Sequence, residues 1–263
     1  MNIKVSLLVP TLGEREAELR RLFDSLTKQS YLNMEVIVVS QDNHQIVDKL
    51  CAEYSDILTV KHLKSDIKGL SLSRNIGLSE VTGEITVLSD DDCWYPSDAM
   101  SKIVSAFTEK PQTDVLLTQI YDPISDSPYK KYDAEPKKIN RITDLLSRSS
   151  IELAFSKRDD MEFDERFGLG ARYVSGEEND FLVSCFRAGM NIFYKPEITV
   201  FHQKKTRQET DAQLNAKGAF YAKNFGFLIS NAVLLRDLLK KHQNNYREFW
   251  NGYFDFKKNK RLP

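Results

Sequence analysis

The first third of the chain alternates short, continuously apolar runs with amphipathic segments. Residues 5–9 form one apolar run, ended by Pro10, and residues 35–39 form a second. Runs without polar alternation are typical of strands buried on both faces of a parallel sheet. Between them, residues 14–29 carry apolar side chains at helical spacing, at Leu19, Leu22, Phe23 and Leu26. The pattern therefore begins as strand, helix, strand.

The same alternation continues along the chain. A second helix is expected with Val47, Leu50, Cys51 and Tyr54 facing inward, and a short helix at residues 71–78. Residues 58–63 and 84–88 are again rich in apolar and β-branched side chains. Because the connections are short, successive strands should be parallel with right-handed crossovers. The sequence predicts an α/β fold, with a mostly parallel central sheet flanked by helices.

Beyond a fifth expected strand at residues 115–119, the pattern breaks. Residues 120–140 are polar, rich in lysine and interrupted by prolines, which is typical of a long functional loop. Two short strands are expected on either side of Pro196, and the remaining residues are helical. We expect a main domain over residues 1–225. Residues 226–263 should form a helical, basic and aromatic extension packed on or beside it.

Charge and cysteine content restrict the possible function classes. The 263 residues carry 37 Lys and Arg against 38 Asp and Glu, so no global positive field attracts nucleic acid. Three scattered cysteines without metal-ligand spacing favour reduced thiols and a cytoplasmic protein. The basic, aromatic carboxyl-terminal residues also suit peripheral contact with an anionic membrane at its cytoplasmic face.

Three adjacent carboxylates, Asp90, Asp91 and Asp92, follow the predicted strand at residues 84–88. Such a cluster must be either well solvated or neutralised by cations, because its charges repel one another. Its position at the carboxyl end of a strand is where open α/β sheets bind their ligands. A hard divalent ion that also holds a diphosphate would suit these oxygen ligands.

Several short motifs, in this order and spacing, make residues 3–225 resemble the family 2 glycosyltransferases, inverting enzymes of the GT-A fold and of bacterial polysaccharide type. These motifs are residues 9–11, 29–31, 73–77, 88–92, 176–181 and 200–202. The resemblance implies transfer of a sugar from a nucleoside-diphosphate donor, with Mn²⁺ or Mg²⁺ as cofactor. The acceptor would be a saccharide or a lipid-linked saccharide, in surface polysaccharide synthesis.

The resemblance also assigns roles to the acidic turn. Asp92 would be a metal ligand, and Asp90 and Asp91 would hold the ribose or waters on the metal. His202 would be a further metal ligand, since a neutral imidazole is acceptable to Mn²⁺. Ser89 departs from the family pattern, because many relatives have another aspartate there.

The nucleotide pocket is expected at the ends of the first two strands. By resemblance, Pro10, Thr11 and Glu14 form one of its walls. Relatives usually have an aspartate at the position of Ser40, where it recognises the edge of uracil. Here Ser40, the glutamine after it or Asp42 would supply the hydrogen bonds, so a base other than uracil is possible.

The chemical step needs a general base to take a proton from the acceptor hydroxyl. In the resembling family the second acid of a Glu-Asp pair does this, which implies Glu178 as base and Glu177 as the residue that steers the acceptor. The reverse assignment stays open. Arg74 would place a cation close to the diphosphate.

Two other functions compete with this interpretation. A nucleotidyltransferase would make the nucleotide sugar, but it needs a glycine-rich, basic loop after the first strand, and residues 11–14 match that poorly. A non-catalytic subunit that binds nucleotide sugars is the other alternative. Its support is the unusual residues Ser40, Ser89 and Glu178.

Overall fold

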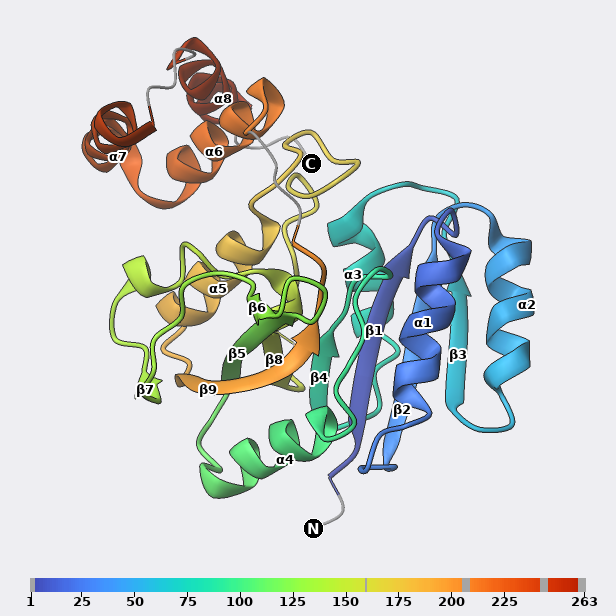
Figure 1. Cartoon of the computed structure of the whole chain (residues 1–263). Helices are drawn as coiled ribbons and strands as arrows, with labels where there is room; N and C mark the ends of the chain where they lie inside the picture. The colour runs from blue at the N-terminus through green and yellow to red at the C-terminus, as the bar shows by residue number, and fades with distance from the viewer. Residues whose placement is uncertain (1–2, 159, 205–208, 242–245, 260–263) are drawn as a thin grey trace.

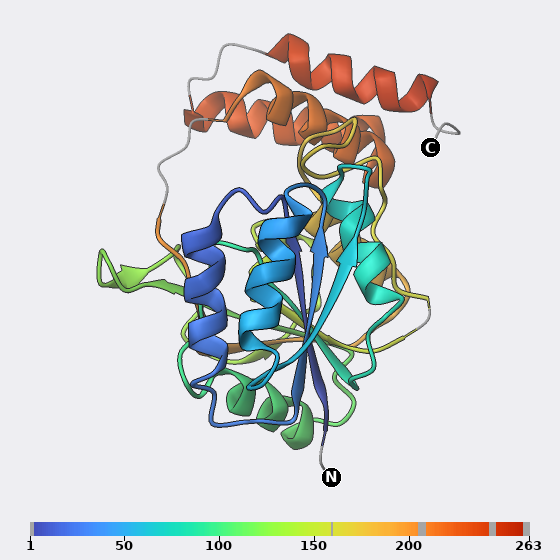
Figure 2. The same ribbon diagram turned by 90° about the vertical axis from the view of Figure 1, so that its right-hand side faces the viewer.

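One mixed β-sheet with helices on both faces forms the body of the molecule, and three carboxyl-terminal helices lie at one end of it (Figures 1 and 2). The computed structural model describes residues 3–158, 160–204, 209–241 and 246–259. The sheet order is β3-β2-β1-β4-β8-β5-β9-β7, with β6 paired to β5. The strands are β1 (Val5–Thr11), β2 (Met34–Ser40), β3 (Thr59–Lys64), β4 (Ile85–Leu88), β5 (Val115–Asp122), β6 (Ser127–Pro128), β7 (Lys137–Lys138), β8 (Leu153–Ser156) and β9 (Ile192–Phe201).

The helices follow the predicted alternation. They are α1 (Glu16–Leu26), α2 (His44–Tyr54), α3 (Leu70–Leu78), α4 (Ala99–Glu109), α5 (Glu177–Arg187), α6 (Asp211–Asn224), α7 (Gly226–Lys241) and α8 (Tyr246–Lys258), with short 3-10 turns at Ile142–Asp144 and Ser150–Glu152. In agreement with the sequence, β1 and β2 are buried along their whole length. The prediction of an α/β fold with a helix-flanked central sheet is confirmed.

The sheet is more mixed than the alternation alone indicates. Its longer ladders, β1 with β2 and β4, β2 with β3, and β5 with β9, are parallel. The short strand β8 lies between β4 and β5 and is antiparallel to both. The direction of β8 depends on where the chain returns to the sheet after the long loop at residues 120–140. The spacing of apolar residues along the sequence does not predict that position.

One local prediction is wrong. The two short strands expected around Pro196 are a single strand, β9. Its register with β5 shifts between Leu117 and Gln119 and again before Ile120. Proline has no N–H to donate, and this irregular stretch of the ladder accommodates it without ending the strand.

The two faces of the sheet bury separate apolar clusters. Leu7 and Val9 face the cluster under α1, α2 and α4, and Leu8 faces the cluster under α3 and α5. A Cβ added at Gly77 on α3 would lie 2.0 Å from Leu8 Cδ1, so α3 packs unusually close to β1. This close contact fixes the carboxyl-terminal end of α3 against the middle of β1.

The carboxyl-terminal helices have a third apolar cluster, built from α6, α8 and the loop around Phe167 and Tyr173. The predicted division at residue 225 separates α6 from α7 and α8, yet α6 packs most extensively on α8. None of the described helices has the length and apolar character needed to cross a membrane. Phe227, Leu228 and Phe254 expose more than half of their surface, and the membrane contact expected for this extension remains a prediction.

Gly218 and Gly252 let α6 and α8 pack backbone to backbone. A Cβ at Gly218 would lie 1.8 Å from the Phe249 carbonyl oxygen, and one at Gly252 would lie 1.9 Å from the Asn215 carbonyl oxygen. Replacing Gly218 with alanine should therefore push the helices apart and lower the free energy of unfolding by about 1–3 kcal/mol. Urea denaturation measures this. Asn251→Ala, on the exposed side of α8, is the control, and equal unfolding midpoints for the two variants would contradict the prediction.

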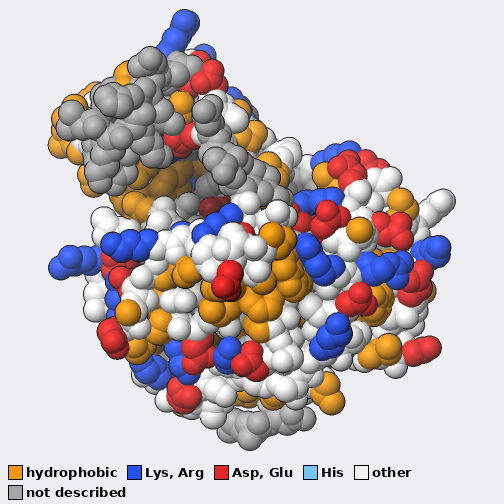
Figure 3. Space-filling view, in the orientation of Figure 1, with side chains coloured by type: hydrophobic (Ala, Val, Ile, Leu, Met, Phe, Trp, Pro, Cys, Tyr) orange, Lys and Arg blue, Asp and Glu red, His pale blue; other side chains and the backbone are white. Residues whose placement is uncertain are grey.

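Charged side chains are dispersed over the face shown in Figure 3, with acidic and basic groups interspersed. This arrangement agrees with the balanced count of 37 and 38 charges.

Candidate active site

A cavity of about 380 Å³ opens at the carboxyl ends of β1, β2 and β4. It is lined from β1 and the loop after it, from the segment that leads into α3, from the acidic turn and from the loop at Leu169 and Gly170. The described lining includes Pro10, Thr11, Leu12, Arg15, Gln41, Lys68, Gly69, Leu70, Asp90, Asp91, Asp92, Leu169, Gly170 and His202. The structure thus brings six of the predicted donor and metal residues to one place.

Arginine and threonine side chains hold two of the carboxylates in the acidic turn. Thr11 Oγ1 donates to Asp91 Oδ2 at 2.6 Å, and Arg15 Nη2 lies 2.7 Å from Asp91 Oδ1. Arg15 also forms an ion pair with Asp92 Oδ2. Burial raises the pKa of Asp91, although Thr11 and Arg15 oppose that shift. Protein cations therefore neutralise much of the repulsion that the sequence indicated.

Arg74 joins the acidic turn to the second carboxylate pair. Its side chain is fully buried, with Nη1 3.3 Å from Glu177 Oε1 and Nη2 3.3 Å from Asp90 Oδ1. The guanidinium carbon also lies 5.3 Å from the centre of the Phe163 ring. A buried cation with two carboxylate partners fixes the distance between them. The two halves of the predicted site therefore form one connected unit.

Glu177 and Glu178 occupy the first turn of α5, after Gly176 in a left-handed conformation (φ 95°). The helix dipole favours acidic side chains there. Burial and the neighbouring Glu177 carboxylate raise the pKa of Glu178 to about 8. The raised pKa makes the deprotonated form a stronger base, which suits a general base that acts as the pH rises above neutral.

Glu14 does not line the cavity. It is exposed, whereas the next residue, Arg15, reaches the acidic turn. Arg15 is not among the residues predicted from the sequence. The available signal was the need for a cation near three adjacent aspartates, with a single arginine in the loop that faces them.

Ser40 and Asp42 also lie outside the cavity lining. Ser40 is fully buried, and its hydroxyl lies 2.6 Å from His44 Nδ1 and 2.7 Å from His62 Nε2. Asp42 pairs with Lys68 at 2.6 Å. Gln41, the first residue after β2, lines the cavity. Its Oε1 accepts from the Gly69 N–H at 2.6 Å.

His202 and Asp92 are suitable ligands for a divalent ion. The Nδ1–H of His202 donates to the Gln203 carbonyl oxygen at 2.7 Å, which leaves a lone pair on Nε2 in the neutral ring. That atom lies 3.1 Å from Asp92 Oδ1. Two facing acceptors need a proton or a cation between them. Adjacent ligands of an octahedral ion at about 2.1 Å would be about 3 Å apart, so this pair fits.

The described residues contain no group of three or more His, Cys, Asp or Glu side chains able to hold a metal. Asp92 and His202 would therefore provide two ligands, and phosphate oxygens and water would provide the rest. This division is usual for Mg²⁺ in phosphate-binding sites.

Comparison with solved structures identifies the fold. The structure of Staphylococcus aureus TarS (residues 1–349) with UDP-GlcNAc matches with a TM-score of 0.68 and 18% identity, over 97% of this chain and 80% of that one. A mannosyltransferase from Pyrobaculum calidifontis, in complex with GDP-Man and Mn²⁺, matches with a TM-score of 0.59 and 15% identity, over 99% and 76%. The fold is that of the GT-A glycosyltransferases.

Residues 6–162 match the glycosyl transferase family 2, and the chain belongs to that family. An uncharacterised glycosyltransferase from Haemophilus influenzae is 26% identical over 98% of this chain and 92% of its own length. The poly(ribitol-phosphate) β-N-acetylglucosaminyltransferase TarS is 25% identical over 97% of this chain. This chain spans only 45% of that enzyme, and 17% of the glycosyltransferase GlyA from Streptococcus pneumoniae. The chain therefore contains a glycosyl transferase family 2 domain.

Proposed function

We propose that this glycosyltransferase is metal-dependent and inverts the anomeric centre as it moves a sugar onto an acceptor hydroxyl. The observation that carries the proposal is the connection through Arg74 between the acidic turn and the pair at the start of α5. Arg74, a buried cation, holds both Asp90, from the turn proposed to bind the donor, and Glu177, from the pair proposed to serve the acceptor. A single displacement needs the leaving group and the base on opposite sides of the sugar carbon, and a fixed distance between the two carboxylates supports such an arrangement.

On the donor side, the nucleotide would occupy the cavity at the ends of β1 and β2, with Thr11 and Gln41 as polar contacts. Gln41 can offer an amide N–H to the base, since its Oε1 is already engaged by Gly69. Asp92 and His202 would hold Mn²⁺ or Mg²⁺. When bound, the ion would offset charge on the departing diphosphate. Lys68 and Arg15 add positive charge to the same cavity.

On the acceptor side, Glu178 would take the proton from the attacking hydroxyl, and Glu177, fixed by Arg74, would orient it. We place the acceptor among saccharides or lipid-linked saccharides of a surface polysaccharide. TarS, which acts on poly(ribitol-phosphate), is a relative consistent with that class.

A thermal-shift screen tests the proposal most directly. Nucleoside diphosphates and nucleotide sugars would be compared with and without Mn²⁺, and the best donor then assayed for transfer and product configuration. We expect one nucleoside diphosphate to stabilise the protein, with a larger shift in Mn²⁺. The absence of any stabilisation by nucleotides, or a product with retained configuration, would refute it.

The pH dependence of kcat/KM should reveal Glu178. Because the pKa of Glu178 is raised to about 8, its basic form is a minority at pH 7 and increases as the pH rises. We therefore expect kcat/KM to climb between about pH 6 and 9. Glu177→Gln should move that limb to lower pH, because the Glu177 charge contributes to the raised pKa. If kcat/KM rose over the same pH range in the wild type and in Glu177→Gln, the titration would belong to another group.

A further inference from the structure

A second hollow, of about 260 Å³, lies in the loop region between β5 and β8. Its walls carry four basic side chains, Lys130, Lys131, Lys137 and Arg148, against two acidic ones, Asp133 and Asp144. The three lysines belong to the lysine-rich stretch at residues 120–140, which the sequence predicts to be a functional loop. Nothing in the proposed donor or base chemistry uses them.

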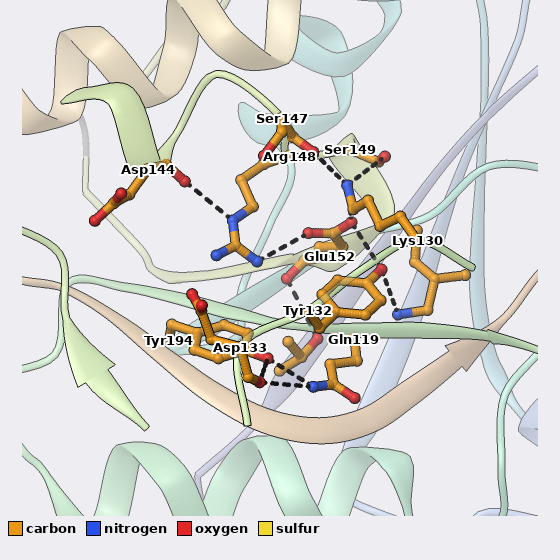
Figure 4. A network of polar contacts seen from close by, with 12 residues as sticks. Gln119, Lys130, Tyr132, Asp133, Asp144, Ser147, Arg148, Ser149, Glu152 and Tyr194 are labelled. Carbon is orange, nitrogen blue, oxygen red and sulfur yellow. Dashed lines mark hydrogen bonds and ion pairs between the residues drawn. The ribbon is translucent and has the colours of Figure 1, made fainter. Parts of the chain in front are cut away.

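A buried carboxylate, Glu152, lies behind the hollow and is shared by two cations (Figure 4). Its side chain is fully buried, forms an ion pair with Lys130 and lies 3.5 Å from Arg148 Nη1. The Tyr132 hydroxyl donates to it at 3.1 Å. Two cations on one carboxylate leave this wall with a net positive charge. Glu152 and Arg148 are buried, so water screens their charges little, and an anion beside Arg148 would be favourable.

Two basic groups keep hydrogen-bonding capacity for such an anion. Lys131 is exposed and has no hydrogen bond or ion pair with the described residues. Arg148 is 8% exposed, and its Nε donates to the Asp144 carbonyl oxygen at 3.3 Å. None of the described residues accepts from its Nη2. Lys137, by contrast, is held by Asp133 at 2.9 Å and by Asp144 at 3.4 Å.

The hollow adjoins the active site through Lys130 and Ser149. Lys130 Nζ lies 3.2 Å from Ser149 Oγ, and Ser149 also lines the donor cavity (Figure 4). Lys130 is close enough to Glu178 for the two charges to interact. The hollow therefore lies beside the donor cavity and close to Glu178, the proposed base.

We propose that this hollow binds a phosphate group of the acceptor, so that the acceptor is a phosphate-bearing polyol or saccharide. An arginine and a lysine with free donors match the oxygens of a phosphate ester. The assignment of the phosphate to an acceptor rests on the proposed function. The phosphate site itself rests on the geometry of Arg148, Lys131 and Glu152.

Calorimetric titration with glycerol 3-phosphate tests the site. The protein is first saturated with Mn²⁺ and its preferred nucleoside diphosphate, so that the donor cavity is filled. We expect saturable binding of glycerol 3-phosphate, competition by inorganic phosphate, and none by glycerol. Lys131→Glu and Arg148→Gln should each weaken binding at least about tenfold. Lys49→Glu, the same charge change on α2 at the far edge of the sheet, should have no effect.

Absence of saturable binding, or equal binding by wild type and Lys131→Glu, would overturn the site. Lys131 is exposed, so this variant stays informative even if Arg148→Gln does not fold. Transfer assays then compare a polyol phosphate with the matching polyol. We expect the phosphate to be the better acceptor and Lys131→Glu to remove most of that preference.

Two further outcomes distinguish the phosphate site from the proposed acceptor and from the proposed function. If phosphate binding needs Lys131 but transfer to phosphate-bearing acceptors does not, the hollow holds free phosphate and the acceptor assignment is wrong. If no nucleotide sugar supports transfer while phosphate binding remains dependent on Lys131, the proposed function fails and the phosphate site stands.

Discussion

Glu178→Gln is expected to lower kcat by about 10²–10⁴-fold, the usual contribution of a positioned general base. Glutamine is isosteric but cannot take a proton from the acceptor hydroxyl. The substitution removes a carboxylate that is protonated much of the time at neutral pH, because burial and Glu177 raise its pKa to about 8. The fold and the donor cavity should therefore change little. Donor affinity, measured by calorimetry, should stay within about threefold of wild type.

Glu177→Gln is the matched comparison, on the adjacent residue of α5. Glu177 contacts Arg74, so its loss should disturb acceptor orientation and KM more than proton transfer. Equal losses of kcat in the two variants would mean that the pair acts as one unit. Retained turnover in Glu178→Gln would remove Glu178 as the base, and full turnover in both would favour a base outside α5.

The parts of the fold that position the site were predictable because their physics is local. Residues 5–9 and 35–39 are each apolar except for one residue, Ser6 and Glu35, and such runs have few alternatives to a buried strand. Once the strands are parallel, their carboxyl ends share one edge of the sheet. Thr11 and the acidic turn therefore had to lie close together, and Thr11 Oγ1 does lie 2.6 Å from Asp91.

Other features depend on side-chain direction or on distant segments, which periodicity does not record. Whether Glu14 or Arg15 points to the acidic turn is decided by how the loop enters α1. Whether Ser40 or Gln41 faces the cavity depends on the strand's orientation in the sheet. The fully buried position of Arg74 requires Asp90 and Glu177, residues separated by 87 positions, to meet around it. The charges around Glu152 likewise come together only after β8 inserts between β4 and β5.

Asp92→Ala is expected to abolish the Mn²⁺-dependent part of donor binding and to lower turnover by at least about 100-fold. Metal ions supply several kcal/mol of charge stabilisation in such transfers, and each 1.4 kcal/mol is a factor of ten. The reason is geometric: Asp92 Oδ1 and His202 Nε2 face one another at 3.1 Å, and no third His, Cys, Asp or Glu joins them within the described residues. Thermal shift with the preferred nucleotide, with and without Mn²⁺, measures the first effect.

Arg15→Ala distinguishes loss of the metal from general damage to the acidic turn. Arg15 forms ion pairs with both Asp91 and Asp92, so its guanidinium competes with a metal ion for the Asp92 carboxylate. Arg15→Ala should therefore leave the affinity for Mn²⁺ unchanged or higher, whereas Asp92→Ala should lose that affinity. If Asp92→Ala keeps Mn²⁺-dependent stabilisation by the donor, the ion is held by other groups. If both variants lose the Mn²⁺-dependent stabilisation equally, the donor site is organised by the salt bridges of Arg15 to Asp91 and Asp92, and not by direct ligation of the metal.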